Sequence, residues 1–290
     1  MPDRAPLIRP SAIAGRWYPG NPTTLRRDIE RYFEAAPKAP LPGRVLGLIA
    51  PHAGYAYSGP TAASAFAQVQ GAAFDRVVLL GPLHRAIWGN PVGPYMVPLE
   101  TAYSTPLGAA PLDNEFIEQL GRRVLLTRVR GDEEHSLEIE LPFLQAALGN
   151  FKLVPIMLAE HVASGKATER ITALAQALGE LVSDTIDGRT LLVCSTDLSH
   201  MENYADVVAT DRRLVELVSA FDIDALRTAL TEESVQACGA VGLLAVMEAC
   251  QRLGARGAQV LQYTNSGEVT GDKRPGTYTV GYLAAAIYDG

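Results

Sequence analysis

The sequence predicts an α/β fold, namely a three-layer α/β/α sandwich around a mixed, mostly parallel sheet. Short runs rich in Val, Leu and Ile, bounded by Gly, Pro or polar residues, are typical of strands buried on both faces. Helical patterns separate most of these runs, as they do in βαβ units. No Pro/Ser/Gly-rich linker, charge block or repeat divides the 290 residues, so we expect a single domain over residues 1–290.

The composition argues against several classes of partner. The formal net charge is −7 and no basic run is present, so nucleic acid is not expected as a partner. The N-terminus MPDRAPLIRP lacks the apolar core of a signal peptide, and the longest apolar stretch, Val280–Tyr288, is too short to span a bilayer. Three cysteines without paired spacing suit a reducing compartment. We therefore expect a cytoplasmic protein without a membrane partner.

The first half of the chain is expected to open with a helix and continue with a βαβ unit. Asn21 followed by Pro22 is a favourable N-cap and first-turn pair. Glu100–Pro111 shows no regular pattern and is expected to be irregular. The predicted elements are a helix over Pro22–Ala35, a strand over Val45–Ala50, a helix over Thr61–Val69, a strand over Arg76–Leu80, an edge strand near Tyr95–Val97 and a helix over Leu112–Leu120.

The second half alternates in the same way and ends with two strands. Their connection, Asn265–Gly276, is Gly-rich and polar, which is typical of a lid or rim. The predicted elements are a helix from near His135 to Leu148, a strand over Lys152–Met157, a helix over Lys166–Val182, a strand over Thr190–Cys194, helices over Tyr204–Ser219, Ile223–Leu230 and Ala240–Leu253, and strands over Ala258–Thr264 and Tyr278–Ala285.

Ligand-type side chains follow three of the predicted buried strands. His52 comes after VLGLIAP, His84 after RVVLLGPL, and Asp197 and His200 after TLLVCST. Because the carboxyl ends of parallel strands meet at one edge of a sheet, we expect these side chains to share a pocket. The alternative is that each histidine is an ordinary loop residue.

Two further residues join this set by their place relative to helices. His135 lies in GDEEHSLEIE at a helix start, where the positive end of the helix dipole would keep its imidazole neutral. The surrounding acids suit that dipole, so most of them need no other role. Cys238 comes just before the helix predicted over Ala240–Leu253, a position that favours the thiolate, the form that binds metal or attacks an electrophile.

The residues by themselves leave three kinds of chemistry open. Imidazole and thiolate ligands suit zinc, iron or copper, but no HExxH or CxxC spacing selects a metal. A hydrolase would use Cys238 as nucleophile, with His52, His135 or His200 as its base and Asp197 as the orienting group. A binding pocket without turnover would be lined by aromatic residues, namely Trp17, Tyr55 and Tyr57.

Six motifs, in this order and at about this spacing, resemble the Memo family, also named after the AmmeMemoRadiSam system. They are GRWYPGNP, LIAPHAGYAYSG, VVLLGPLH, DEEHSLEIELPFL, STDLSH and QACG, and the resemblance extends from about Arg9 to Tyr288. The family's fold is similar to that of class III extradiol dioxygenases, which use non-haem iron. The chain departs from the family pattern at Arg85, where a second histidine is frequent, and at Met201–Asn203, where Trp-Gly is common.

The resemblance implies a metal site and a surrounding pocket. Its metal ligands fall on His52, His84 and Cys238, with iron (Fe²⁺) favoured, copper next and zinc less so. The pocket carries over as His135, Asp197 and His200 for proton handling, with Trp17 and Tyr55 at its mouth. We therefore expect a metal-dependent redox or dioxygenase-like enzyme that takes a small-molecule or peptide ligand and is functionally linked to a radical-SAM protein. A non-catalytic binding protein and a Cys-dependent hydrolase are the alternatives.

Overall fold

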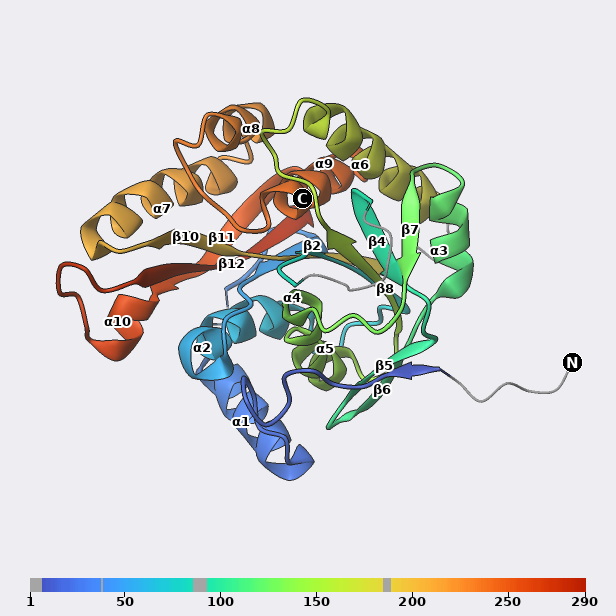
Figure 1. The fold of residues 1–290 in the computed structure, drawn as a ribbon, viewed down its shortest axis with the longest axis horizontal. Helices are drawn as coiled ribbons and strands as arrows, with labels where there is room; N and C mark the ends of the chain where they lie inside the picture. Colours follow the sequence, from blue (N-terminus) through green and yellow to red (C-terminus); the bar gives the residue numbers. More distant parts are fainter. Residues whose placement is uncertain (1–6, 38, 86–92, 185–188) are drawn as a thin grey trace, which may run out of the picture.

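The computed structural model describes residues 7–37, 39–85, 93–184 and 189–290, and it confirms the predicted α/β sandwich (Figure 1). A nine-stranded mixed sheet lies between two layers of helices. Its strands are β2 (Arg44–Ala50), β3 (Arg76–Pro82), β4 (Tyr95–Pro98), β7 (Leu126–Val129), β8 (Lys152–Leu158), β9 (Thr190–Ser195), β10 (Asp197–Met201), β11 (Gly257–Asn265) and β12 (Thr279–Asp289).

The strand order places the ends of three parallel strands together. The order is β10-β12-β2-β9-β3-β8-β4-β7, and β11 also pairs with β12. Strands β2, β9, β3 and β8 are parallel, whereas β12 and β4 run antiparallel to their neighbours β2 and β8. In register, Ala50 lies beside Ser195 and Leu80 beside Cys194. The segments that leave β2, β9 and β3 therefore start from one edge of the sheet.

Helices cover both faces of the sheet (Figure 1). Helix α9 is buried along most of its length, because it packs on β9 and β2 and is itself covered by α6. On that face lie α6 (Ala167–Ser183), α7 (Tyr204–Ser219), α8 (Ile223–Thr231) and α9 (Ala240–Arg252). On the other face lie α1 (Pro22–Ala35), α2 (Tyr55–Phe66), the single turn η1 (Ala67–Val69), α4 (His135–Glu138), α5 (Leu141–Leu148) and α10 (Ser266–Thr270).

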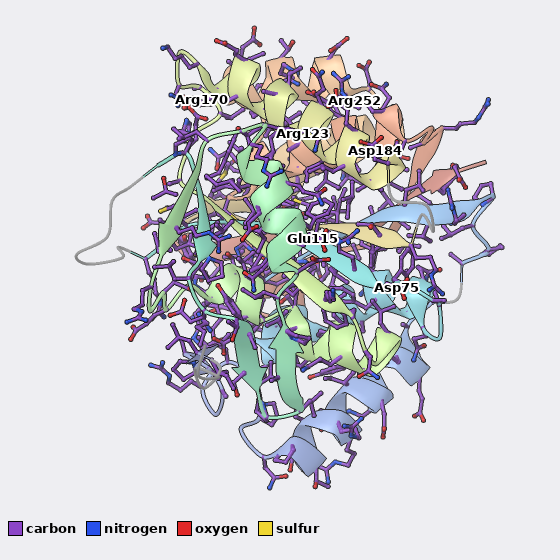
Figure 2. All side chains as sticks on the ribbon, turned by 90° about the vertical axis from the view of Figure 1, so that its right-hand side faces the viewer. Asp75, Glu115, Arg123, Arg170, Asp184 and Arg252 are labelled. Carbon is purple, nitrogen blue, oxygen red and sulfur yellow. The ribbon has the colours of Figure 1, made fainter. Side chains whose placement is uncertain are left out.

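Helix α3 (Asn114–Gly121) packs beside α6 at the β8 side of the sheet. Figure 2 shows side chains filling the space between the ribbons there, with labelled charged residues such as Arg123 and Asp184 at the outside. The Arg123 guanidinium lies 3.6 Å from the carboxylates of both Glu180 and Asp184. Exposed ion pairs of this kind contribute about 0.2–1 kcal/mol each, so the apolar core carries most of the stability.

The structure differs from the predicted elements at several places, of which three concern the strands and helices described next. Glu100–Pro111, expected to be irregular, forms β5 (Ala102–Thr105) and β6 (Gly108–Pro111), which make a separate three-stranded sheet with β1 (Ile8–Arg9). This sheet depends on pairing with the distant N-terminal arm, which local propensity does not report. Asp197–Met201, to which no element was assigned, is a strand because it pairs with β12. Helix α2 begins at Tyr55, six residues before the predicted start, since Pro60 is tolerated at an exposed position of a helix whose other face is buried.

No helix among the described residues combines the length and the apolar character that a bilayer crossing requires.

Candidate functional site

Three histidines converge at the edge of the sheet where β2 and β3 end. His52 lies two residues past β2, His84 two residues past β3, and His135 opens α4. Each offers a ring nitrogen, and these nitrogens all lie within 4.8 Å of one another. The ring centroids of His84 and His135 are 4.7 Å apart, and that of His52 lies 5.2 Å from His84. Neutral imidazoles are common metal ligands, so this group could hold a metal ion.

The approach of α4 to β3 depends on a glycine at the end of that strand. A Cβ atom on Gly81 would lie 2.8 Å from both Ser136 Oγ and Leu137 Cδ2, too close for a real contact. In the space that glycine leaves, Ser136 Oγ donates a hydrogen bond of 2.7 Å to the Pro82 carbonyl. This bond fixes α4 on β3 and so places His135 opposite His84.

The ring of His52 is oriented by Ser195 at the end of β9. Nδ1 of His52 lies 2.9 Å from Ser195 Oγ. The Ser195 hydroxyl donates to the Ser136 carbonyl at 2.6 Å and to the Glu140 carboxyl at 2.8 Å. Its single proton is taken up by these acceptors, so the network assigns the ring proton of His52 to Nδ1, which donates to Ser195. Nε2 is then left free, as a metal-binding imidazole requires.

Glu134 organises the other two histidines. Its Oε1 lies 3.1 Å from Nδ1 of His84 and accepts from the backbone N–H groups of His135 and Ser136 at 2.9 Å. Its Oε2 accepts from the His84 backbone N–H at 2.6 Å. Burial alone would raise the pKa of this carboxyl, but His84, His135 and the Ser136 N–H lower it to about 2. Glu134 therefore stays ionised, caps α4 and leaves Nε2 of His84 available.

Cys238 reaches the site from the segment before α9. Its Sγ lies 3.1 Å from Nε2 of His52 and accepts from the Asp197 N–H, also at 3.1 Å. A Cβ atom on Gly239 would lie 2.7 Å from the Ser195 carbonyl oxygen, so only glycine lets this segment lie against the end of β9. Burial, followed by the nearby Asp197 carboxylate, raises the pKa of the Cys238 thiol. The backbone N–H groups of Asp197 and Gly239 lower this pKa, but burial raises it more, so the position before the helix does not by itself favour the thiolate.

Asp197 and His200 lie on β10 and take different positions. The Asp197 carboxylate accepts from the His52 backbone N–H at 2.8 Å and lies 4.0 Å from Nε2 of the ring. It therefore fixes the backbone of His52 more than its imidazole. Burial raises the pKa of Asp197 to about 7. His200 is outside the group of three histidines, and its Nδ1 lies 3.0 Å from the Leu198 carbonyl oxygen.

An apolar pocket of about 470 Å³ opens on the three histidines. Trp17, Tyr57 and Tyr278 line it, and the Trp17 ring packs 4.4 Å from the His135 ring, centroid to centroid. The expectation that Tyr55 stands at the mouth is corrected by its position. Tyr55 is 4% exposed, donates to the Ile139 carbonyl at 2.9 Å and packs on Phe143, so it belongs to the core. Tyr57, two residues on and 46% exposed, takes the pocket position.

Comparison with known proteins assigns the chain to a family. The family model described as Memo-like protein matches residues 9–286. The chain belongs to the Memo family. A MEMO1 family protein from Thermotoga neapolitana is 34% identical over 97% of this chain and 100% of its own. Members from Methanosarcina acetivorans and Methanopyrus kandleri are 33% and 32% identical, over 97% and 98% of this chain and 99% and 100% of theirs.

The residues of this Memo-family site fit a metal ion. Nδ1 of His135 is buried and has no hydrogen-bond partner, although it lies 3.1 Å from Glu134 Oε1, because that contact is poorly aligned. Burial lowers the pKa of His135 to about 4 and that of His52 well below its usual value, so both rings are neutral at pH 7. Metals bind neutral imidazoles through one ring nitrogen while the other nitrogen is held by a hydrogen bond. Ser195 holds Nδ1 of His52 in this way, and Glu134 holds Nδ1 of His84.

Sequence reasoning missed three residues that organise the site. Glu134, Ser195 and Glu140 lie within the motifs, but the acids were assigned to the helix dipole and Ser195 was given no role. All three have an exposed fraction of 0%. The only local signal was the density of acids in DEEHSLEIE, which exceeds what a four-residue helix needs at its first turn.

Proposed function

We propose that this Memo-family protein is a metal-dependent redox enzyme of dioxygenase-like type, with His52, His84 and Cys238 as its ligands. The observation that supports this most directly is the convergence of the His52, His84 and His135 nitrogens within 4.8 Å of one another. The Cys238 sulfur lies outside that group of three but 3.1 Å from His52 Nε2. Two imidazoles and a thiolate suit iron or copper, and we favour iron. His135, the third member of the histidine group, would stand beside the ion as a further ligand or as a group facing substrate.

A bound iron or copper ion would supply Lewis acidity and one-electron chemistry. The residues of the chain orient the ligand rings and accept or release protons. Ser195 and Glu134 hold the rings of His52 and His84 in one orientation. His135 and His200, with pKa values lowered by burial, are neutral at pH 7 and can accept a proton from a bound ligand. The carboxyl of Asp197, with its pKa raised to about 7, can hold or release a proton beside them.

The apolar pocket favours a substrate with an aromatic or other flat apolar group. The Trp17 ring already packs against His135 at a tilt of 51°, and Tyr57 and Tyr278 also line the pocket. Aromatic walls bind flat apolar groups through buried area and ring contacts. A small molecule or the aromatic side chain of a peptide would therefore face the three imidazoles.

Metal titration tests this proposal. We expect anaerobic Fe²⁺ and Cu⁺ titrations of wild type to reach about one ion per chain, and Cys238→Ser to lower the affinity by about 10–100-fold or more, as disturbed metal sites do. Cys250→Ser is the matched control, because Cys250 is buried in α9 and, unlike Cys238, lines neither of the pockets at the site. An unchanged metal affinity in Cys238→Ser together with a lower affinity in His135→Gln would show that the third ligand is His135 and not Cys238. Absence of binding in wild type would reject the metal proposal.

The binding-protein alternative rests on the same apolar pocket. It predicts tight capture of an aromatic metabolite or peptide with no oxygen consumption by the metal-loaded protein, which calorimetry and an oxygen electrode distinguish. The hydrolase alternative is weakened by two contacts. Nδ1 of His52 is held by Ser195 and not by Asp197, and burial raises the pKa of Cys238. Turnover that iodoacetamide abolishes and a chelator leaves intact would favour hydrolysis.

A further inference from the structure

A second pocket, polar in its lining, lies on the sulfur side of the site. It has a volume of about 300 Å³, and its titratable or polar lining residues are Glu160, His161, His200, Glu233, Gln236 and Cys238. Of all its lining residues, it shares only His200 with the apolar pocket. Cys238 lines this polar pocket, whereas His52, His84 and His135 line the apolar one. The proposed centre therefore lies between two cavities of different chemistry.

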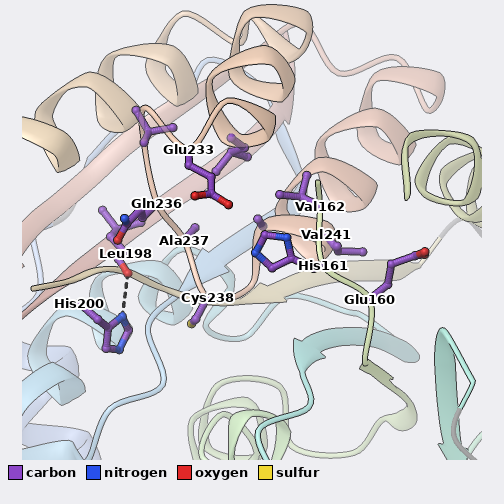
Figure 3. A pocket seen from close by; sticks show the side chains of 13 residues that line it. Glu160, His161, Val162, Leu198, His200, Glu233, Gln236, Ala237, Cys238 and Val241 are labelled. Atoms are coloured by element: carbon purple, nitrogen blue, oxygen red, sulfur yellow. Dashed lines mark hydrogen bonds between the residues drawn. The ribbon is translucent and has the colours of Figure 1, made fainter. Parts of the chain in front are cut away.

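Two side chains in the polar pocket are available to a cation. Figure 3 shows the Glu233 carboxylate and the His161 ring projecting over the pocket from different segments, with Cys238 beyond them. The Glu233 carboxylate has no hydrogen-bond or ion-pair partner among the described residues. His161 accepts from the Ala163 N–H through Nδ1 at 3.3 Å, which leaves Nε2 free. Glu160 contributes less, because Arg170 holds its carboxylate at 2.6 Å and Figure 3 shows it turned away.

The carboxylate, imidazole and thiol of the polar pocket are all possible metal ligands, but they do not lie close enough together to bind one ion. Within the described part of the chain, the histidine trio is the one group of three ligand-type side chains whose ligand atoms lie within 4.8 Å of one another. Glu233, His161 and Cys238 are thus too dispersed to hold an ion together. A cavity with separate carboxylate, imidazole and thiol groups suits the passage of a cation by successive contacts.

The apolar pocket offers a poorer path for a cation. Arg16 lies in its lining and repels positive charge, and the walls are formed by Trp17, Tyr57 and Tyr278. The Asp197 carboxylate lines this pocket too, but its Oδ1 is occupied by the hydrogen bond from the His52 backbone N–H, 2.8 Å away. We infer that the metal ion enters and leaves through the polar pocket, past Glu233 and His161 to Cys238, while the apolar pocket receives the organic substrate. This inference rests on the proposed metal centre.

Metal exchange kinetics test the route independently of any enzyme activity. The probe is Fe²⁺ under anaerobic conditions, loaded into the apo protein and then withdrawn by an excess of a chromogenic chelator in a stopped-flow instrument. The variant Glu233→Gln/His161→Gln should slow both loading and withdrawal by about 5-fold or more, with the equilibrium affinity unchanged, because an attractive lining raises the local cation concentration by about 10-fold or more. Gln keeps the side-chain length and leaves the left-handed backbone of Glu233 (φ 55°) under the same strain.

Matched controls separate the route from general effects. Glu232→Gln removes the same charge at an exposed residue outside the lining, and its exchange rates should equal those of wild type. Gln236→Trp narrows the polar pocket and Ala56→Trp narrows the apolar one, both at exposed positions. We expect only Gln236→Trp to slow Fe²⁺ exchange.

The outcomes distinguish the route from the centre. Slower exchange in Ala56→Trp with wild-type rates in Gln236→Trp would assign entry to the apolar pocket and overturn the inference. Fe²⁺ binding by wild type with unchanged rates in Glu233→Gln/His161→Gln and in Gln236→Trp would overturn the route and leave the proposed function standing. A wild-type protein that binds no Fe²⁺ or Cu⁺ would overturn both.

Discussion

Glu138 and Glu140 lie two residues apart, and each has an exposed fraction of 0%, yet their surroundings are opposite. The Glu138 carboxylate accepts from the Arg9 guanidinium and from four other donors, Ser11 Oγ, the N–H groups of Ala12 and Ile13, and Tyr18 OH. Glu140 accepts from Ser195 alone, and its Oε2 has no partner among the described residues. One carboxylate anchors the N-terminal arm, whereas the other lies behind the candidate metal centre.

The difference appears in the pKa values. Burial would raise the pKa of Glu138, but Arg9, Ser11 and the Ala12 N–H bring it below its usual value. Burial raises the pKa of Glu140 well above its usual value, and the Asp197 carboxylate adds repulsion, while no cation among the described residues offsets either effect. A buried carboxylate that is fully paired serves the fold, whereas one with a single neutral partner is found next to chemistry.

The largest expected effect comes from removing the cation of the first cluster. Arg9 is 0% exposed and also donates to Asp132 at 3.0 Å and to the Glu134 carbonyl at 2.7 Å. Arg9→Met leaves two buried carboxylates without their cation, so the free energy of unfolding should fall by about 3–5 kcal/mol. Urea denaturation followed by circular dichroism measures this. Arg9→Met/Glu138→Gln should recover part of the loss, and a fall below about 1 kcal/mol in Arg9→Met would mean that the cluster contributes little.

The two glutamates give the most direct test of the comparison. Glu138→Gln should lower the free energy of unfolding at pH 7 by about 2 kcal/mol, because buried donors lose a charged acceptor. Glu140→Gln should not lower it at pH 7, since a neutral amide replaces a buried carboxyl that has no cation and whose pKa is raised. Both variants are compared with wild type in one denaturation series. Equal losses in the two variants would contradict the distinction drawn here.

The pH dependence of the free energy of unfolding also distinguishes Glu138 from Glu140, because the two carboxyls contribute to it with opposite signs. The pKa of Glu140 is raised in the folded state, so its carboxyl costs no stability below its unfolded pKa of about 4.5 and lowers stability as pH rises above it. The pKa of Glu138 is lowered, so its contribution is present above about 4.5 and is lost as pH falls below that value. Relative to wild type, Glu140→Gln should therefore gain stability from pH 5 to 8. A constant difference over that range would show that Glu140 titrates as in the unfolded chain.

The smallest expected effect separates the core tyrosine from the pocket tyrosine. Tyr55→Phe removes the hydroxyl that donates to the Ile139 carbonyl and should cost about 1 kcal/mol. Tyr57→Phe, at an exposed position, should leave the free energy of unfolding unchanged within about 0.5 kcal/mol. The reverse ranking would place Tyr55 in the pocket after all.

Much of the fold follows from local patterns. The helices over Pro22–Ala35 and Tyr204–Ser219 have the predicted bounds, because each has an asparagine N-cap and an apolar stripe. The buried strands β2, β3, β8 and β9 begin and end within two residues of their predicted bounds, since their apolar runs end at Pro, Gly or polar residues. The separate sheet of β1, β5 and β6 was not predicted, because its strands are short and lack an apolar alternation.

The sequence alone determined where ligand-type side chains leave the sheet, because strand ends and helix starts are set within a few residues. Only the tertiary structure decided which acids face those side chains. Glu134 meets His84 across 50 residues, Ser195 meets His52 across 143, and Arg9 meets Glu138 across 129. Burial, charge pairing and the protonation of a carboxyl depend on such distant neighbours, so two glutamates in one motif acquire opposite roles only when the chain has folded.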